Sequence, residues 1–227
     1  LKNTTKTATG KSWTMGNQLT FSGSGELDNG MDVSLSFVID QGDDTSASTG
    51  PFDSHSVTVS SDALGTLVFS GEGGSSASSA IDTTAAGDLW NNGSGFTAPR
   101  AAEAGDNSMM YTLPSLMDDL TLKASYSPGS AGGGSATAWS ASYSGVEGLS
   151  VDYAVGQTDT IGSEEEQVVM KGSYAWGSFT IGASNTTNKY DAAASVDEEI
   201  SSWEVAYTVS DDLSISYGTE TLDTEGS

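Results

Sequence analysis

Short segments in which apolar residues alternate with small polar residues recur in pairs along this chain, and a tight turn joins the two members of each pair. The clearest pair runs from Leu19 to Ile39 and reverses direction at Asp28-Asn29-Gly30. Strict alternation predicts a β-strand with two different faces, and an Asn-Gly turn between two such runs predicts a β-hairpin. Twelve strands are expected, paired as hairpins within residues 19–39, 57–69, 109–126, 139–155, 168–183 and 203–217.

The polar face of these strands indicates what surrounds the sheet. It carries mainly Ser, Thr and Gly, which is typical of a barrel wall that meets water inside and an apolar medium outside. Connections alternate between tight turns and longer polar stretches, as in transmembrane barrels with short turns at one rim and long loops at the other. The pattern predicts an all-β fold, a transmembrane antiparallel up-and-down barrel. The longer connections are expected at residues 41–54, 71–107, 128–135, 157–166 and 185–199.

Composition excludes several other classes of protein. The 227 residues contain 31 Asp plus Glu against 7 Lys plus Arg, which gives a formal net charge of −24. Such a chain cannot supply the basic surface that a nucleic acid requires. It has no cysteine and no apolar run long enough for a transmembrane helix. The chain opens without a signal peptide, so a mature form or a fragment is expected.

Charged residues on the polar parity of the strands are the first candidates for a functional site. A lysine facing lipid at mid-membrane costs roughly 2–4 kcal/mol, which favours placement on the water-filled side. Opposed acidic and basic side chains in a narrow passage create a transverse field that acts on polar solutes. Parity assigns to this lumen-facing set Glu26, Asp32, Asp152, Glu204, Lys123 and Lys171.

The hairpin Leu19-Thr20-Phe21-Ser22-Gly23-Ser24-Gly25-Glu26-Leu27-Asp28-Asn29-Gly30-Met31-Asp32-Val33-Ser34-Leu35-Ser36 resembles one found in the general bacterial porins, particularly those of alphaproteobacteria. The segment Ser61 to Phe69 is similar to the porin strand that leads into the constriction loop. The resemblance implies a 16-stranded, trimeric outer-membrane barrel whose third external loop narrows the pore. That loop would be residues 71–107, with Asp82, Asp88, Glu103, Asp106 and Arg100 as its charged candidates. Arg100 would either filter solutes or hold the loop by pairing with a carboxylate.

The chain departs from the family pattern at both ends. Twelve strands are visible of an expected 16, and no strand with a terminal aromatic residue closes the sequence. The simplest interpretation is a single barrel domain over residues 1–227 that is partial, with one strand missing before it and three after.

The function expected from this resemblance is passive diffusion of small hydrophilic solutes and ions across the outer membrane of a Gram-negative bacterium. The expected partners are outer-membrane lipid and two further copies of the chain, with no cofactor, and the acidic excess favours a mild cation preference. A secreted acidic β-rich surface or adhesin domain is the alternative, and an outer-membrane enzyme barrel is a third hypothesis. His55 is the only histidine and has no catalytic pattern around it, while Asp40, Asp43, Asp44 and the run Glu164 to Glu166 could bind Ca²⁺.

Overall fold

The computed structural model describes residues 18–39, 52–78, 107–129, 134–160, 163–191, 196–210 and 213–226. Within these ranges the regular structure consists of twelve β-strands, which confirms the number expected from the alternating segments. The strands are β1 (Leu19–Glu26), β2 (Asp32–Ile39), β3 (Phe52–Ser61), β4 (Gly65–Glu72), β5 (Ser108–Thr112), β6 (Leu120–Ser127), β7 (Ser135–Tyr143), β8 (Leu149–Thr160), β9 (Ser163–Trp176), β10 (Phe179–Tyr190), β11 (Val196–Ser210) and β12 (Leu213–Gly226). In this part of the chain, no helix is long and apolar enough to cross a membrane.

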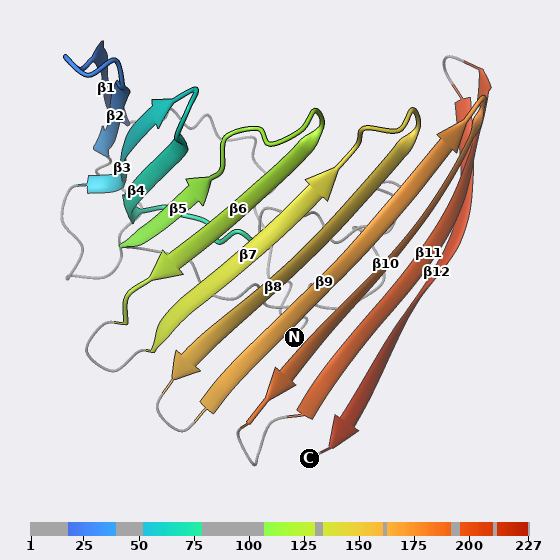
Figure 1. Cartoon of the computed structure of the whole chain (residues 1–227). Helices are drawn as coiled ribbons and strands as arrows, with labels where there is room; N and C mark the ends of the chain where they lie inside the picture. The colour runs from blue at the N-terminus through green and yellow to red at the C-terminus, as the bar shows by residue number, and fades with distance from the viewer. Residues whose placement is uncertain are drawn as a thin grey trace, which may run out of the picture.

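All twelve strands form one sheet in sequence order, and each strand pairs antiparallel with the next. The sheet is curved, and β10 to β12 turn away from the plane of the preceding strands (Figure 1). β1 and β12 are the two edges, so the described strands form an open wall. This is the up-and-down order of a barrel, without the crossover connections that sandwiches require.

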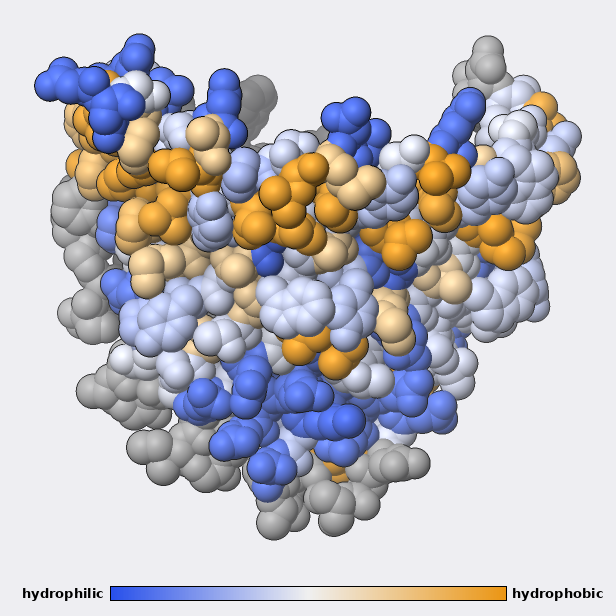
Figure 2. Space-filling view, in the orientation of Figure 1, coloured by the Kyte–Doolittle hydropathy of each residue, from blue (hydrophilic) through white to orange (hydrophobic). Residues whose placement is uncertain are grey.

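The two faces of the sheet differ in the way that the alternation predicts. Large apolar side chains on one face are well exposed, for example Phe21 at 50%, Trp139 at 48% and Ile215 at 59%. They form an apolar band across the strands, with hydrophilic margins at both ends (Figure 2). The other face carries small and polar residues. A secreted adhesin domain would have its apolar residues buried between two sheets, and this arrangement contradicts that alternative.

The tight turns depend on glycine at positions that other residues adopt with strain. Gly30 and Gly65 have φ angles of 79° and 78° in the turns after β1 and β3. A Cβ atom at Gly30 would meet nothing within 4 Å, whereas one at Gly65 would lie 2.7 Å from the Pro114 nitrogen. Glycine is therefore required at position 65 for two reasons, the left-handed backbone conformation and the close approach of the neighbouring chain.

Replacing these two glycines by alanine separates the two effects. Gly30→Ala should lower the free energy of unfolding by about 1–2 kcal/mol, the cost of a left-handed conformation for a residue with a Cβ. Gly65→Ala should cost more than this, because its methyl group also collides with the backbone of Leu113 and Pro114. Denaturant titration of both variants in detergent measures the difference. Equal losses for the two variants would show that the close approach at Gly65 is relieved without cost.

The last five strands are longer than the alternation of apolar residues indicates. β8 reaches Thr160 and β9 begins at Ser163, so the connection expected over residues 157–166 shrinks to residues 161–162. The connection expected over residues 185–199 likewise shrinks to 191–195. These two predictions of long loops were wrong because the strands continue where both faces are polar, beyond the apolar band.

Candidate channel wall and constriction

The six charged residues that parity assigns to the lumen share one face of the sheet, as two cross-strand pairs on distant strands and two separate positions. Glu26 and Asp32 are directly opposite each other beside the turn between β1 and β2. Asp152 on β8 is directly opposite Lys171 on β9. Lys123 lies between Thr112 and Ser140, and it shares a transverse row with Asp32, Ser60 and Thr66.

Glu204 occupies a narrow niche between two glycines. It pairs with Gly182 on β10 and with Gly218 on β12, and its side chain is only 1% exposed. A Cβ atom at Gly218 would lie 2.9 Å from the Glu204 Cα atom, so glycine is needed at this neighbouring position. Within the described residues, the Glu204 Oε2 atom has no hydrogen-bond partner. Glu204 is therefore set into the sheet rather than projecting from it.

Polar contacts connect the strands around Lys171. Ser184 on β10 is directly opposite Lys171, and Ser202 on β11 is directly opposite Ser184. The hydroxyl groups of Ser184 and Ser202 lie 2.6 Å apart. One step further along this row, on β12, is Glu220. The alternation of apolar residues does not point to Glu220, because it fades after Tyr217. Continuing the period of two from Ser214, Ser216 and Gly218 would have found it.

The charges on the polar face are distributed unevenly across the sheet. Among the described residues, acidic side chains of the polar face lie on β1 and β2 at one edge and on β11 and β12 at the other, and single acids lie between them on β4 (Glu72), β8 (Asp152) and β9 (Glu165). The two lysines, Lys123 and Lys171, lie on the central strands β6 and β9. When a sheet curves into a barrel, its two edges come round to the same side. The acids of the two edges and the two lysines would then face each other from opposite sides of the lumen.

The segment that follows β4 runs onto the polar face of the sheet (Figure 1). Ser76, Ala77 and Ser78 are buried, at 1%, 0% and 2% exposure. The Ala77 backbone N–H donates a hydrogen bond of 2.9 Å to the Ser125 hydroxyl of β6. The N–H of Asn107, just before β5, donates a 3.0 Å hydrogen bond to the Gly71 carbonyl. The charged candidates Asp82, Asp88, Arg100, Glu103 and Asp106 lie outside the described residues.

The two other candidates from the sequence have different surroundings. His55 lies within β3, where its ring stacks on Phe37 with centroids 6.3 Å apart and packs against Gly71. Glu164, Glu165 and Glu166 alternate across β9, so consecutive carboxylates point to opposite faces. Among the described residues, no group of three His, Cys, Asp or Glu side chains is placed to hold a metal ion. The structure thus gives no support to a Ca²⁺ site built from that run, and Asp40, Asp43 and Asp44 lie outside the described residues.

The comparison with families of known proteins decides what this sheet is. A sequence model of the family described as "Gram-negative porin" matches residues 2–227. This chain belongs to the Gram-negative porin family. The porin is accordingly an outer-membrane channel, embedded in the membrane and open to solutes and ions. Members of this family are channels, and membership therefore favours a channel over an outer-membrane enzyme barrel.

Solved structures share the fold of this porin at low sequence identity. A porin refined at 1.8 Å is 17% identical, with a TM-score of 0.62 over 91% of this chain and 76% of the other. The anion-selective porin of Comamonas acidovorans is 15% identical, with a TM-score of 0.56 over 92% of this chain and 69% of the other. The outer membrane protein OmpT of Vibrio cholerae is 15% identical, with a TM-score of 0.55 over 92% and 74% of the two chains. A search of curated proteins found no match.

Proposed function

We propose that this porin passes small hydrophilic solutes through a lumen that residues 71–107 narrow. The observation that carries the proposal is the burial of Ser76, Ala77 and Ser78 against the polar face. A loop that stayed on the outer rim would not need to place its first residues beside Ser125. The hydrogen bond between Asn107 and Gly71 holds the two ends of the segment together at its base.

The charges of the wall make this passage mildly cation-preferring. Carboxylates outnumber lysines on the described polar face, and the acidic edges of the sheet stand opposite Lys123 and Lys171 in a closed barrel. A transverse field of this kind orients polar solutes and water in a confined space. The sequence of residues 71–107 adds the acids Asp82, Asp88, Glu103 and Asp106, and one cation, Arg100. Arg100 keeps its two alternative roles here, as a filter or as the partner of a loop carboxylate.

Three copies of the chain associate through the outer face of β1 to β4. Trp and Tyr gather where a barrel meets lipid headgroups. β7 to β12 carry such residues on the outer face, including Trp139, Tyr174 and Trp203, but β1 to β4 contain neither Trp nor Tyr. The outer face of these first strands instead exposes Phe21, Leu35 and Phe69. An apolar face without interfacial aromatic residues fits contact with protein better than contact with a lipid interface.

Removal of the Ser125 hydroxyl tests whether the segment is held against the wall. Ser125→Ala leaves the buried Ala77 N–H without its acceptor, which should cost about 1–3 kcal/mol locally. The segment should then be released, with noisier single-channel currents and faster protease cleavage within residues 71–107. Ser140→Ala is the matched control, since Ser140 is another buried serine of the polar face, on β7. Equal currents and cleavage rates for Ser125→Ala and the wild type would contradict a held constriction segment.

A further inference from the structure

Serines form a continuous row across the first five strands on the polar face. Ser22 lies directly opposite Ser36, and the strand register continues this row through Ser56 and Ser70 to Ser108. Ser24, Ser34 and Thr58 form the beginning of the next row. Neighbouring strands are about 4.8 Å apart, so hydroxyl groups recur at a spacing comparable with the width of one sugar ring.

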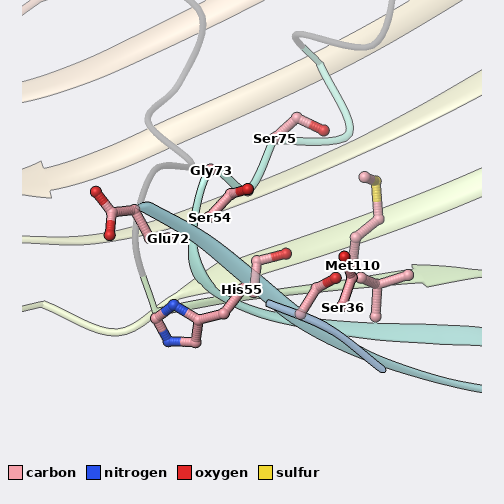
Figure 3. A pocket seen from close by; sticks show the side chains of 11 residues that line it. Ser36, Ser54, His55, Glu72, Gly73, Ser75 and Met110 are labelled. Atoms are coloured by element: carbon pink, nitrogen blue, oxygen red, sulfur yellow. The ribbon is translucent and has the colours of Figure 1, made fainter. Parts of the chain in front are cut away.

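The row borders a cavity between β2, β3, β4 and the segment after β4. The cavity has a volume of about 310 Å³, at the lower end of the range for small-molecule sites. Figure 3 shows Ser36, Ser54 and Ser75 reaching its wall from three different segments, with His55 and Glu72 to one side. A second cavity, of about 460 Å³, shares Ser36 and Ser56 with the first.

The lining chemistry selects a class of solute. Hydroxyl groups both donate and accept hydrogen bonds, and a neutral polyol presents the same groups in return. Val68 and Met110 supply an apolar part of the lining, suited to the C–H face of a sugar ring. Among the described residues that line the two cavities there is no lysine or arginine, and Glu72 is the one acid. Within this described part of the lining, no lysine or arginine offers an anionic solute a counter-charge.

We propose that these two cavities form a binding site for neutral oligosaccharides on the channel wall, built by the serines of β1 to β4. The site deepens the proposed function and rests on it, because a sugar reaches this wall only through an open lumen. It is separate from the charged wall around Asp152 and Lys171, on β8 and β9. Charged and neutral solutes therefore follow different sides of the same passage.

Block of ion current by maltotriose tests this site. The wild-type porin, reconstituted in a planar bilayer, should lose conductance in a saturable way as maltotriose is added. The double variant Ser56→Ala, Ser70→Ala should raise the half-blocking concentration about five- to ten-fold, as expected for the loss of two hydrogen bonds. The variant Ser140→Ala, Ser142→Ala, which removes two serines from the polar face of β7, should leave that concentration unchanged.

The possible results distinguish a failure of the sugar site from a failure of the proposed channel function. Block normalised to each variant's own open conductance separates sugar binding from changes in pore size. The site is refuted if maltotriose acts no more strongly than polyethylene glycol of equal size, or if both double variants shift equally. Currents that persist without any sugar effect would leave the narrowed channel standing and remove only the sugar site. Absence of current before sugar is added would instead overturn the proposed function and the site with it.

Discussion

Val151→Arg should lower the free energy of unfolding from a bilayer by about 2–4 kcal/mol, the cost of an arginine facing lipid near mid-membrane. Val151 lies on the apolar face of β8, is 43% exposed, and pairs with Tyr143 and Gly172. Tyr143, Val151 and Gly172 form one row across the strands. The aromatic residues Trp176 and Phe179 are on one side of this row, near the tight turns, and charged residues are on the other side, at the other end of the strands. Denaturant titration of the protein folded into lipid vesicles measures the loss.

The adjacent residue supplies the control for this prediction. Ser150 is on the opposite face of the same strand, and pairs with Ser173. Ser150→Arg should fold with nearly wild-type stability and reduce conductance instead, because its side chain enters the water-filled lumen. Similar losses of stability for Val151→Arg and Ser150→Arg would contradict the assignment of one face to lipid and the other to water.

Lys171→Glu should shift the ion preference of the channel strongly toward cations. The change replaces one of the two lysines of the described polar face with a carboxylate, opposite Asp152 and in the row that leads to Glu220. Two like charges in a confined passage change the energy of a permeating ion by about 1 kcal/mol or more, so the cation-to-anion permeability ratio should rise roughly three- to ten-fold. Reversal potentials under a salt gradient report this ratio directly.

Lys189→Glu controls for net charge, since it makes the same change at an exposed position near the end of β10. Lys189 pairs with Glu166 on the outward parity of the sheet, away from the polar face. Its field is screened within about 8 Å at physiological ionic strength, so the permeability ratio should stay close to the wild-type value. A shift as large as that of Lys171→Glu would mean that overall charge, rather than the wall at Lys171, governs selectivity.

Much of the sheet could be predicted from the sequence because one face of a membrane wall must be apolar. Leu19 to Ile39 shows why: its alternation and its Asn-Gly turn specify strands, register and faces together. Alternation gives no signal where that requirement ends. Residues 157–166 and 185–199 lack it because their strands continue beyond the apolar band, with polar side chains on both faces.

The candidate site was predictable to a smaller extent. Parity puts Asp152 and Lys171 on the polar face, but their direct pairing depends on the register of β8 with β9. Burial of Glu204 depends on the two glycines that flank it on other strands, which no local pattern reveals. The serine row has the same origin: each serine looks like an ordinary polar position until five strands are aligned.

Single-channel recording of the purified protein in a planar bilayer, under a tenfold salt gradient, tests whether this chain forms a cation-preferring trimeric channel. A trimeric channel with an acidic wall should give stepwise ohmic currents that appear in groups of three and a reversal potential displaced modestly toward the cation value. Folded protein that stays in solution without detergent and gives no current would contradict it.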